Sequence, residues 1–192
     1  YPFEFIVVDC YSREHALDYH LAGVGMARKI GMDFALDYAK KNSLLCSIDA
    51  DTIISKNYLT TIVSEYKDKN FSSAVVNFKH QKNNNSSIQK GIILYESLLK
   101  KIANNIKKTG SPYGFVSMGS TMICTIKAYI AVGGMSPKKA TEDFYFLQRL
   151  AKYDTIYLIK KVLVYPSARS EQRVYLGTGY RMKNIKNKDT FN

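Results

Sequence analysis

Two aspartates separated by one residue, Asp49 and Asp51, are the strongest candidates for chemistry in this sequence. They follow an apolar run that begins at Leu44 and is typical of a buried strand. In an extended chain, side chains two residues apart point to the same side, so both carboxylates would project from the end of this strand. Paired carboxylates repel each other unless a cation joins them, and their hard oxygen atoms suit Mg²⁺ or Mn²⁺. The pair therefore predicts a metal site that could bridge to a diphosphate, with a solvated turn as the alternative.

A second acidic pair, Glu142 and Asp143, lies at the expected start of a helix. Thr141 is a good N-cap residue, so both acids fall in the first helical turn. The helix dipole favours a charged carboxylate there, and a general base must be charged at neutral pH. Acids at helix starts also need no function beyond capping, so the position alone leaves both interpretations open.

Apolar runs alternate with amphipathic stretches along the chain, which favours an α/β sheet flanked by helices. Strands are expected at residues 4–9, 44–49, 72–78, within 115–126 and at 155–165. Helices are expected at residues 23–42, 56–69, about 88–108, 127–132 and 141–153. A polar loop is expected at 81–90, and paired glycines at 133 and 134 should end the short fourth helix.

The spacing of apolar residues also predicts which side of each helix is buried. The side chains expected on these sides are Ala27, Ile30, Phe34 and Tyr38; Leu59, Ile62, Val63 and Tyr66; Ile88, Ile92, Tyr95, Leu99, Ile102 and Ile106; and Phe144, Leu147 and Ala151. These amphipathic helices are expected to cover the faces of the sheet.

The composition is that of one folded domain. The chain has 192 residues, 46% of them apolar and 23% charged, and it shows neither an internal repeat nor a linker between two domains. Its three cysteines are unclustered, which argues against a disulfide framework and a cysteine zinc site and favours a reducing compartment such as the cytoplasm. No apolar run approaches the roughly 18 residues that span a bilayer.

The formal net charge of +12 favours anionic partners such as nucleoside diphosphates, anionic lipid surfaces or nucleic acid. Eight basic residues lie within 160–192, against the acids Glu171 and Asp189. The sequence shows no zinc-finger spacing and no helix-turn-helix signature, which argues against a nucleic-acid partner. The lysines of the expected helix at 88–108 could rest on an anionic membrane or cover an acceptor site, although plain packing also explains such a helix.

Three segments, in this order, resemble blocks of the family-two inverting glycosyltransferases, which have the GT-A fold. They are Ile6-Val7-Val8-Asp9, Gly25-Met26-Ala27-Arg28-Lys29-Ile30-Gly31 and Ser47-Ile48-Asp49-Ala50-Asp51. The resemblance implies that Asp9 contacts the nucleotide base and that Arg28 lies near the base and the diphosphate. It also implies that Asp49 contacts the ribose and that Asp51, together with Asp49, holds the metal. The implied fold is a Rossmann-like mixed sheet flanked by helices.

Three further segments resemble the acceptor-side block of the same family. They are Gly133-Gly134-Met135, Thr141-Glu142-Asp143 and Arg149-Leu150. The resemblance implies that Asp143 removes the proton from the acceptor hydroxyl, and that Glu142 positions the acceptor or orders the helix start. The acceptor oxygen would then attack the anomeric carbon in line with the departing nucleoside diphosphate, which inverts the anomeric configuration.

The basic tail at 166–192 is similar to a loop that closes over the diphosphate in related enzymes. Arg169 and Arg173 are the candidates for diphosphate contacts, because arginine pairs well with phosphate oxygens; ordinary surface charge is the alternative. The family's Gln-x-x-Arg-Trp pattern is only partly matched by Gln172-Arg173, and the chain has no Trp. Processive polymer synthesis is therefore poorly supported.

The beginning of the chain departs from the family pattern. Members usually have an earlier strand and loop that hold the nucleotide, and a helix and a strand where this chain has only ten residues between Ser12 and Gly23. The chain begins at Tyr1 without Met, at what resembles the second strand. We therefore expect either preceding residues or a shortened fold.

The sequence thus predicts one metal-dependent glycosyltransferase domain, with a donor half at about 1–80, an acceptor half at about 81–165 and the basic tail. The expected partners are a nucleoside-diphosphate sugar, with uridine as the favoured base, and a glycan or lipid-linked acceptor, with room for contact at the inner face of a membrane. A sugar-phosphate nucleotidyltransferase and a non-catalytic nucleotide-sugar-binding domain are the alternatives. The first lacks a visible glycine-rich phosphate loop, and the presence of Asp49, Asp51 and Asp143 argues against the second.

Overall fold

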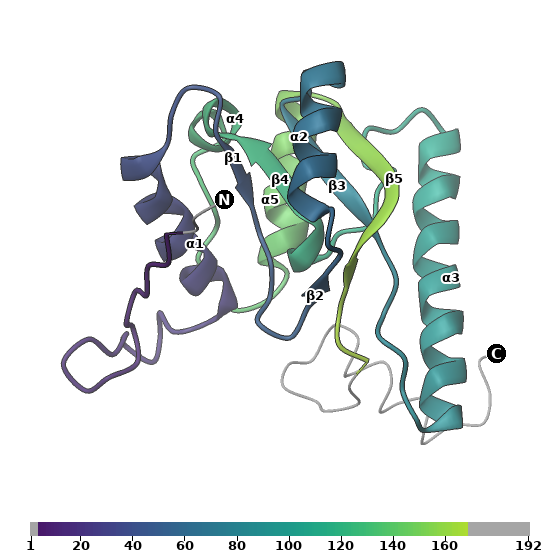
Figure 1. Ribbon diagram of the computed structural model, residues 1–192, viewed down its shortest axis with the longest axis horizontal. Helices are drawn as coiled ribbons and strands as arrows, with labels where there is room; N and C mark the ends of the chain where they lie inside the picture. Colours follow the sequence, from purple (N-terminus) through teal and green to yellow (C-terminus); the bar gives the residue numbers. More distant parts are fainter. Residues whose placement is uncertain (1–3, 169–192) are drawn as a thin grey trace.

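The structure, a computed structural model, describes residues 4–168, which form a five-stranded mixed sheet flanked by helices (Figure 1). The helices are α1 (Val24–Ala35), α2 (Tyr58–Lys69), α3 (Ser86–Lys108), α4 (Ile126–Ala131) and α5 (Glu142–Tyr153), with 3₁₀ turns η1 (Leu36–Tyr38) and η2 (Gly119–Thr121). The strands are β1 (Leu44–Cys46), β2 (Ile53–Ile54), β3 (Ser73–Phe78), β4 (Met122–Thr125) and β5 (Ile156–Tyr165). This architecture confirms the predicted α/β class with a mixed sheet flanked by helices.

The sheet order β1-β4-β3-β5-β2 brings the ends of three strands that are distant in sequence to one edge. β3 and β5 are parallel, whereas β4 is antiparallel to both β1 and β3, and β2 is antiparallel to β5. β1, β3 and β5 therefore run in the same direction, and their carboxyl ends meet at the same edge. In open α/β sheets this is the edge where ligands bind.

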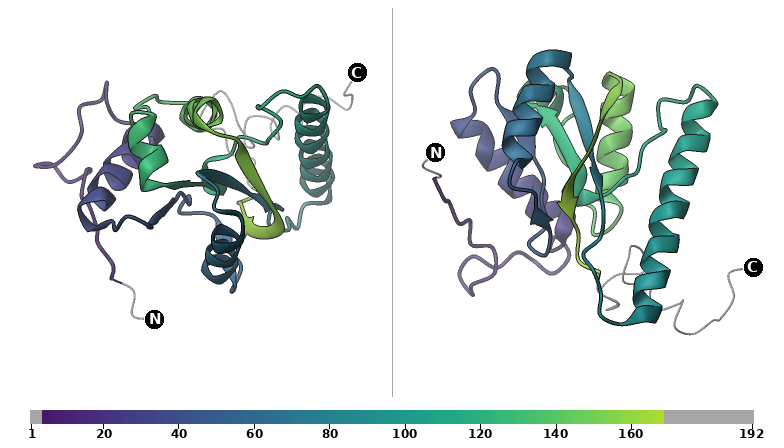
Figure 2. Two further views of the ribbon diagram at one scale, coloured as in Figure 1. Left: turned by 90° about the horizontal axis from the view of Figure 1, so that it is seen from above. Right: turned by 45° about the vertical axis from the view of Figure 1, so that its right-hand side comes forward.

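Successive side chains of the strands alternate between two buried layers. Leu45 and Val75 belong to a cluster that also contains Leu150 of α5 and residues of α1 and α4. The neighbouring strand residue Val76 points to the other layer, where it joins a cluster that contains Ile62 of α2. Figure 2 shows α2 and α5 on opposite faces of the sheet, so each layer is covered by helices.

The turn after α4 is fixed by two glycines and one arginine. Gly133 and Gly134 have φ values of 75° and 70°, and they end the helix as predicted. Arg149 donates one hydrogen bond to the carbonyl of Val132 at 2.8 Å and another to the carbonyl of Gly134 at 2.7 Å. These bonds tie α5 to the end of α4.

Most predicted elements are present, several with shorter bounds. The strands predicted at 44–49, 72–78, 115–126 and 155–165 correspond to β1, β3, β4 and β5, and the five predicted helices correspond to α1–α5. α1 ends earlier than expected, at Ala35, and the polar loop ends at Asn85, whose side chain caps α3. β2 was not predicted, because its two residues form a strand only through pairing with Val164 and Tyr165.

The strand predicted at residues 4–9 is wrong. The segment contains β-branched and apolar residues, but the sheet formed by residues 4–168 does not include it. Phe5 is 89% exposed and Val7 is 74% exposed. A strand requires hydrogen bonds from a neighbouring strand, and a local apolar pattern does not provide that neighbour.

The buried side predicted for α1 is only partly correct, because only Ile30 and Phe34 of its four residues are half-buried. Its buried residues are Gly25 and Met32, whereas Ala27 is exposed and Tyr38, in η1, is 60% exposed. α1 turns a glycine and Arg28 toward the rest of the protein, and a search for large apolar side chains does not detect such a face.

The sides of α2, α3 and α5 that contact the sheet are narrower than their apolar sides. In α5, Phe146 and Leu150 are buried beside Leu147. Four residues that were predicted to be buried are instead exposed: Leu59, Val63, Ile102 and Phe144.

α3 is the longest helix, and it lies beside β5 in Figure 1. Its buried residues include Ile88 and Ile92, and the ammonium group of Lys100 donates a hydrogen bond to the carbonyl of Phe78 at 3.0 Å. In the described part of the chain, neither α3 nor any other helix has the length and apolarity needed to cross a bilayer.

Candidate functional site

One guanidinium group joins the acids of the two candidate sites. Arg28, in the middle of α1, donates through Nη2 to Asp49 after β1 and through Nη1 to Glu142 at the start of α5. Its side chain is only 11% exposed, and that of Glu142 is only 5% exposed. Segments that lie 21 and 114 residues away from Arg28 in sequence are thereby held at one point.

Asp49 is held from a second direction by Ser120 of η2. The Ser120 hydroxyl donates to Asp49 Oδ2 at 2.7 Å, and the backbone N–H of Asp49 donates to Ser120 Oγ at 3.2 Å. Thr52 adds a hydroxyl contact to Ser120 at 2.8 Å. Both carboxylate oxygens of Asp49 are therefore engaged. Ser120 was not predicted, because no spacing rule links a serine before one strand to an acid 71 residues earlier.

Gly119 lets the guanidinium group reach this position. A Cβ atom at Gly119 would overlap Nη2 of Arg28 and lie 3.0 Å from Nη1. Because Arg28 is fixed by two carboxylates, it has little freedom to move away. The glycine is thus a packing requirement of the Asp49–Arg28–Glu142 cluster.

Burial dominates the electrostatics of Glu142. It raises the pKa of the carboxyl above its ordinary value of 4.5. A backbone hydrogen bond and the positive charge of Arg28 oppose this rise, whereas the negative charges of Asp143 and Asp49 add to it. The positive charge of Arg28 therefore favours the charged form of Glu142, and burial opposes that form.

The start of α5 has an unusual backbone. Thr141 occupies the N-cap position, but its side chain makes no capping hydrogen bond and donates instead to the carbonyl of Ala140 at 2.6 Å. The prediction of a side-chain cap is therefore wrong. The φ angle of Thr141 is 60°, a region that β-branched residues rarely adopt. Strained residues of this kind concentrate at functional sites.

Asp143 follows Glu142 in the first turn of α5 and is half-buried. Its Oδ1 accepts a hydrogen bond from the backbone N–H of Phe144 at 2.7 Å. Its charge acts on the carboxyl of Glu142, so the two acids are electrostatically linked. Of the second candidate pair, Glu142 thus forms one end of the Arg28 bridge, and Asp143 is the next residue in the chain.

Asp51 lies in a turn after β1. The backbone N–H of Thr52 donates to the carbonyl of Asp49 at 3.0 Å, and this bond closes a turn around residues 50 and 51. The premise of an extended chain through the two aspartates is therefore wrong. The side-chain amide of Gln81 donates to the carbonyls of Asp51 and Tyr165 at 2.9 and 2.8 Å. Gln81, which follows β3 and was not predicted, thus connects the turn after β1 to the end of β5.

An apolar groove of about 390 Å³ runs between α1 and β1 and reaches the Arg28–Asp49 pair. Its lining includes Ala27, Gly31 and Ile48. The groove thus lies directly beside the polar cluster.

Alanine replacement of Gly25 is expected to destabilise the protein by about 1–3 kcal/mol, the usual cost of overpacking. A Cβ there would lie 2.7 Å from the carbonyl of Ser136 and closer still to that of Lys138, and both obstacles are backbone atoms. Urea unfolding measures the change. Gly31→Ala in the same helix is the control, since nothing lies within 4 Å of its Cβ; it should stabilise α1 by about 0.5–1 kcal/mol. Equal effects at both glycines would contradict this packing of α1.

Asp9 is not among the hydrogen-bond partners of the Asp49–Arg28–Glu142 cluster. Asp9 lies in the exposed N-terminal segment, where its carboxylate accepts hydrogen bonds from the backbone N–H groups of Tyr11 and Ser12. Hydrogen bonds with Ser12 and Tyr11 lower the pKa of Asp9 to about 2. Arg169 and Arg173 lie outside the described residues.

Among residues 4–168, no three His, Cys, Asp or Glu side chains form a cluster that could hold a metal ion. Comparison with protein-family models and with curated proteins gives no match for this chain.

Proposed function

We propose that this chain is the catalytic domain of an inverting glycosyltransferase with the GT-A fold. It would move a sugar from a nucleoside-diphosphate sugar to a hydroxyl of a glycan or lipid-linked acceptor. The observation that carries the proposal is the Arg28 bridge, which joins Asp49 of the expected donor half to Glu142 of the expected acceptor half. This contact between three segments that resemble separate blocks of the family supports the proposal, and it lies at the kind of sheet edge where open α/β folds bind ligands.

The proposal includes a divalent metal, for which Asp51 would be the protein ligand. Asp49 would keep its bonds with Arg28 and Ser120 while the carboxylate of Asp51 contacts the ion. Mg²⁺ in such sites commonly uses one or two carboxylates and completes its shell with substrate phosphates and water. Bound Mg²⁺ or Mn²⁺ would neutralise charge on the departing diphosphate. Asp49, held by its two partners, would orient the ribose.

The start of α5 would supply the base. Asp143 would take the proton of the acceptor hydroxyl as the acceptor oxygen attacks the anomeric carbon, and the nucleoside diphosphate would leave from the opposite face. Glu142 lies beside it but is fixed by Arg28, so its role is to order the helix start. The groove between α1 and β1 would bind the base of the donor, for which uracil is the favoured candidate. Asp9, Arg169 and Arg173 would complete the donor site.

Donor binding should be metal-dependent and should require Asp51. With a matching donor at about 100 times its dissociation constant, binding adds about 2.7 kcal/mol, or roughly 5–10 °C in Tm. We would measure Tm with UDP-, GDP- and dTDP-sugars, with and without Mn²⁺, and expect a rise with one nucleotide that Asp51→Ala abolishes.

Asp68→Ala, an exposed acid on α2, is the control and should retain the rise. If no donor raises Tm in the folded protein with Mn²⁺ present, the proposed donor site is wrong. Release of pyrophosphate, and not of a nucleoside diphosphate, would identify a nucleotidyltransferase. Donor binding without any transfer would identify a non-catalytic binding domain.

A further inference from the structure

Helix α3 presents an apolar stripe to solvent. Leu94, Leu98 and Ile102 are 59%, 46% and 47% exposed. They are spaced four residues apart, so they lie along one side of the helix. The side of α3 that packs on the protein is a different one, and includes the buried Ile88 and Ile92. Within residues 4–168, the stripe is therefore not part of the packing between α3 and the rest of the fold.

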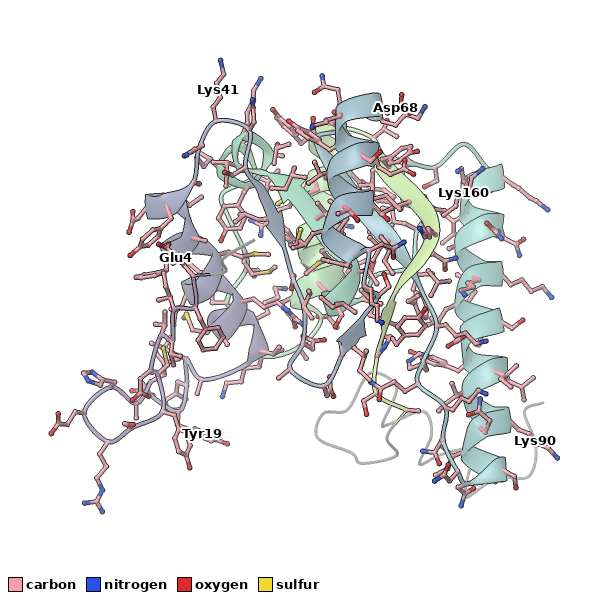
Figure 3. All side chains as sticks on the ribbon, viewed as in Figure 1. Glu4, Tyr19, Lys41, Asp68, Lys90 and Lys160 are labelled. Atoms are coloured by element: carbon pink, nitrogen blue, oxygen red, sulfur yellow. The ribbon has the colours of Figure 1, made fainter. Side chains whose placement is uncertain are left out.

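Lysines border this stripe. Lys90, Lys101 and Lys108 are exposed, and their spacings of 11 and 7 residues place them on one side of the helix, next to the stripe. Figure 3 shows Lys90 extending from α3 away from the sheet. The only acid of α3, Glu96, faces inward, where it accepts a hydrogen bond from the His80 ring at 2.8 Å. The outer side of α3 is thus positive without a compensating acid.

We propose that this outer side of α3 docks on an anionic membrane surface. An interfacial helix places an apolar stripe among the acyl chains and basic residues at the headgroups, and the outer side of α3 has both. The lysines would pair with lipid phosphates, while Leu94, Leu98 and Ile102 would leave water. The net charge of +12 adds a long-range attraction toward such a surface.

Charge also argues against two other partners that could cover the stripe, namely the segment 169–192 and a second copy of the chain. The segment 169–192 contains six basic and two acidic residues, so the lysines of α3 would repel it. In a dimer with two-fold symmetry, the row formed by Lys90, Lys101 and Lys108 would face the same row of the second copy, and the two rows would repel each other. An anionic lipid surface is the partner whose charge complements the row. The proposal does not depend on transferase activity, so its failure and that of the proposed function are distinguishable.

Vesicle flotation of the full chain tests the proposal. The probes are vesicles of phosphatidylcholine alone and of a two-to-one mixture with phosphatidylglycerol. We expect the protein to float with the mixed vesicles only, and less so at high salt. Lys90→Glu/Lys101→Glu/Lys108→Glu should lower the partition coefficient at least roughly tenfold, and Leu94→Ser/Leu98→Ser/Ile102→Ser should do the same.

The matched control is Leu59→Ser/Val63→Ser on α2, which removes a similarly exposed apolar pair from a helix that also carries Glu65 and Asp68. It should float like the unmodified protein. Circular dichroism confirms folding, and if the serine variant unfolds, the lysine variant, which changes only exposed positions, decides alone.

Three outcomes would overturn the proposal. The first is a protein that does not float with either vesicle. The second is flotation that the variants of α3 leave unchanged, which would assign binding to another region such as the basic tail. The third is a dimer, seen by light scattering, that the serine variant of α3 disperses, because the stripe would then be the contact between two copies.

Discussion

Replacement of Arg28 by methionine is expected to destabilise the protein by about 3 kcal/mol at neutral pH. The change leaves the buried carboxylate of Glu142 and the carboxylate of Asp49 without their shared cation, and breaking a buried ion pair typically costs about 3–5 kcal/mol. The lower end of this range applies because Asp49 is 37% exposed. Urea unfolding of the variant and the parent measures the difference.

The loss of stability caused by Arg28→Met should become smaller as the pH falls. Burial already raises the pKa of Glu142, and removal of the guanidinium charge would raise it further. A carboxyl whose pKa is higher in the folded state binds its proton more tightly there, so acidification favours folding. The variant should therefore regain stability relative to the parent as the pH falls from 7 through the raised pKa toward the ordinary value of 4.5.

The surface pair Lys29–Asp33 provides the control for Arg28. Its ammonium and carboxylate are 2.6 Å apart on α1, but both side chains are partly exposed. Lys29→Met should cost at most about 0.5 kcal/mol, because exposed pairs contribute little. Adding Glu142→Gln to Arg28→Met should recover part of the loss. If Arg28→Met were as mild as Lys29→Met, the bridge would not be a structural element of the site.

Asparagine in place of Asp143 is expected to lower sugar transfer by about 10²- to 10⁴-fold, the usual contribution of a general base. Asparagine can still accept the N–H of Phe144, but it does not take up a proton from the acceptor. Stability and donor affinity should remain close to those of the parent. The measurements are the rate of nucleoside-diphosphate release with the donor found by thermal shift, and the donor affinity by titration.

Asp154, at the other end of α5, is the matched control for Asp143. Its Oδ1 accepts a hydrogen bond from the next backbone N–H, that of Thr155, at 2.7 Å, just as Asp143 accepts from Phe144. Asp154→Asn should leave the rate unchanged. A similar loss in both variants, or a full rate in Asp143→Asn, would show that Asp143 is not the base.

Elements with strong local signals were predictable from the sequence, and elements that depend on distant partners were not. The buried run of β3 and the long periodic stretch of α3 contain in themselves the information that specifies them. Residues 4–9 have the composition of a strand, but a strand forms only where a neighbour offers hydrogen bonds. β2 shows the opposite case, because two residues become a strand through their pairing with the end of β5.

The same distinction applies to the site. The acids were recognisable as candidates because carboxylates after a strand and at a helix start are familiar patterns. Arg28 was a candidate from a resemblance, but its bridge between Asp49 and Glu142 was not predicted. Ser120 and Gln81 were not candidates, because their roles arise only when segments 71 and 30 residues away fold against them. The turn at Asp51 was also missed, since the side-chain periodicity of a strand does not reveal where that strand ends.

The shared guanidinium group makes the two halves of the chain interdependent. A fragment that ended before α3 would keep Arg28 with Asp49 but would lack Glu142, its most deeply buried partner. The complementary fragment would have to bury the carboxylate of Glu142 with no cation beside it. The first fragment would lose one of the two partners of Arg28, and the second would lose the only cation paired with Glu142 within residues 4–168, so we expect the pieces to acquire native structure only when mixed, as in fragment complementation.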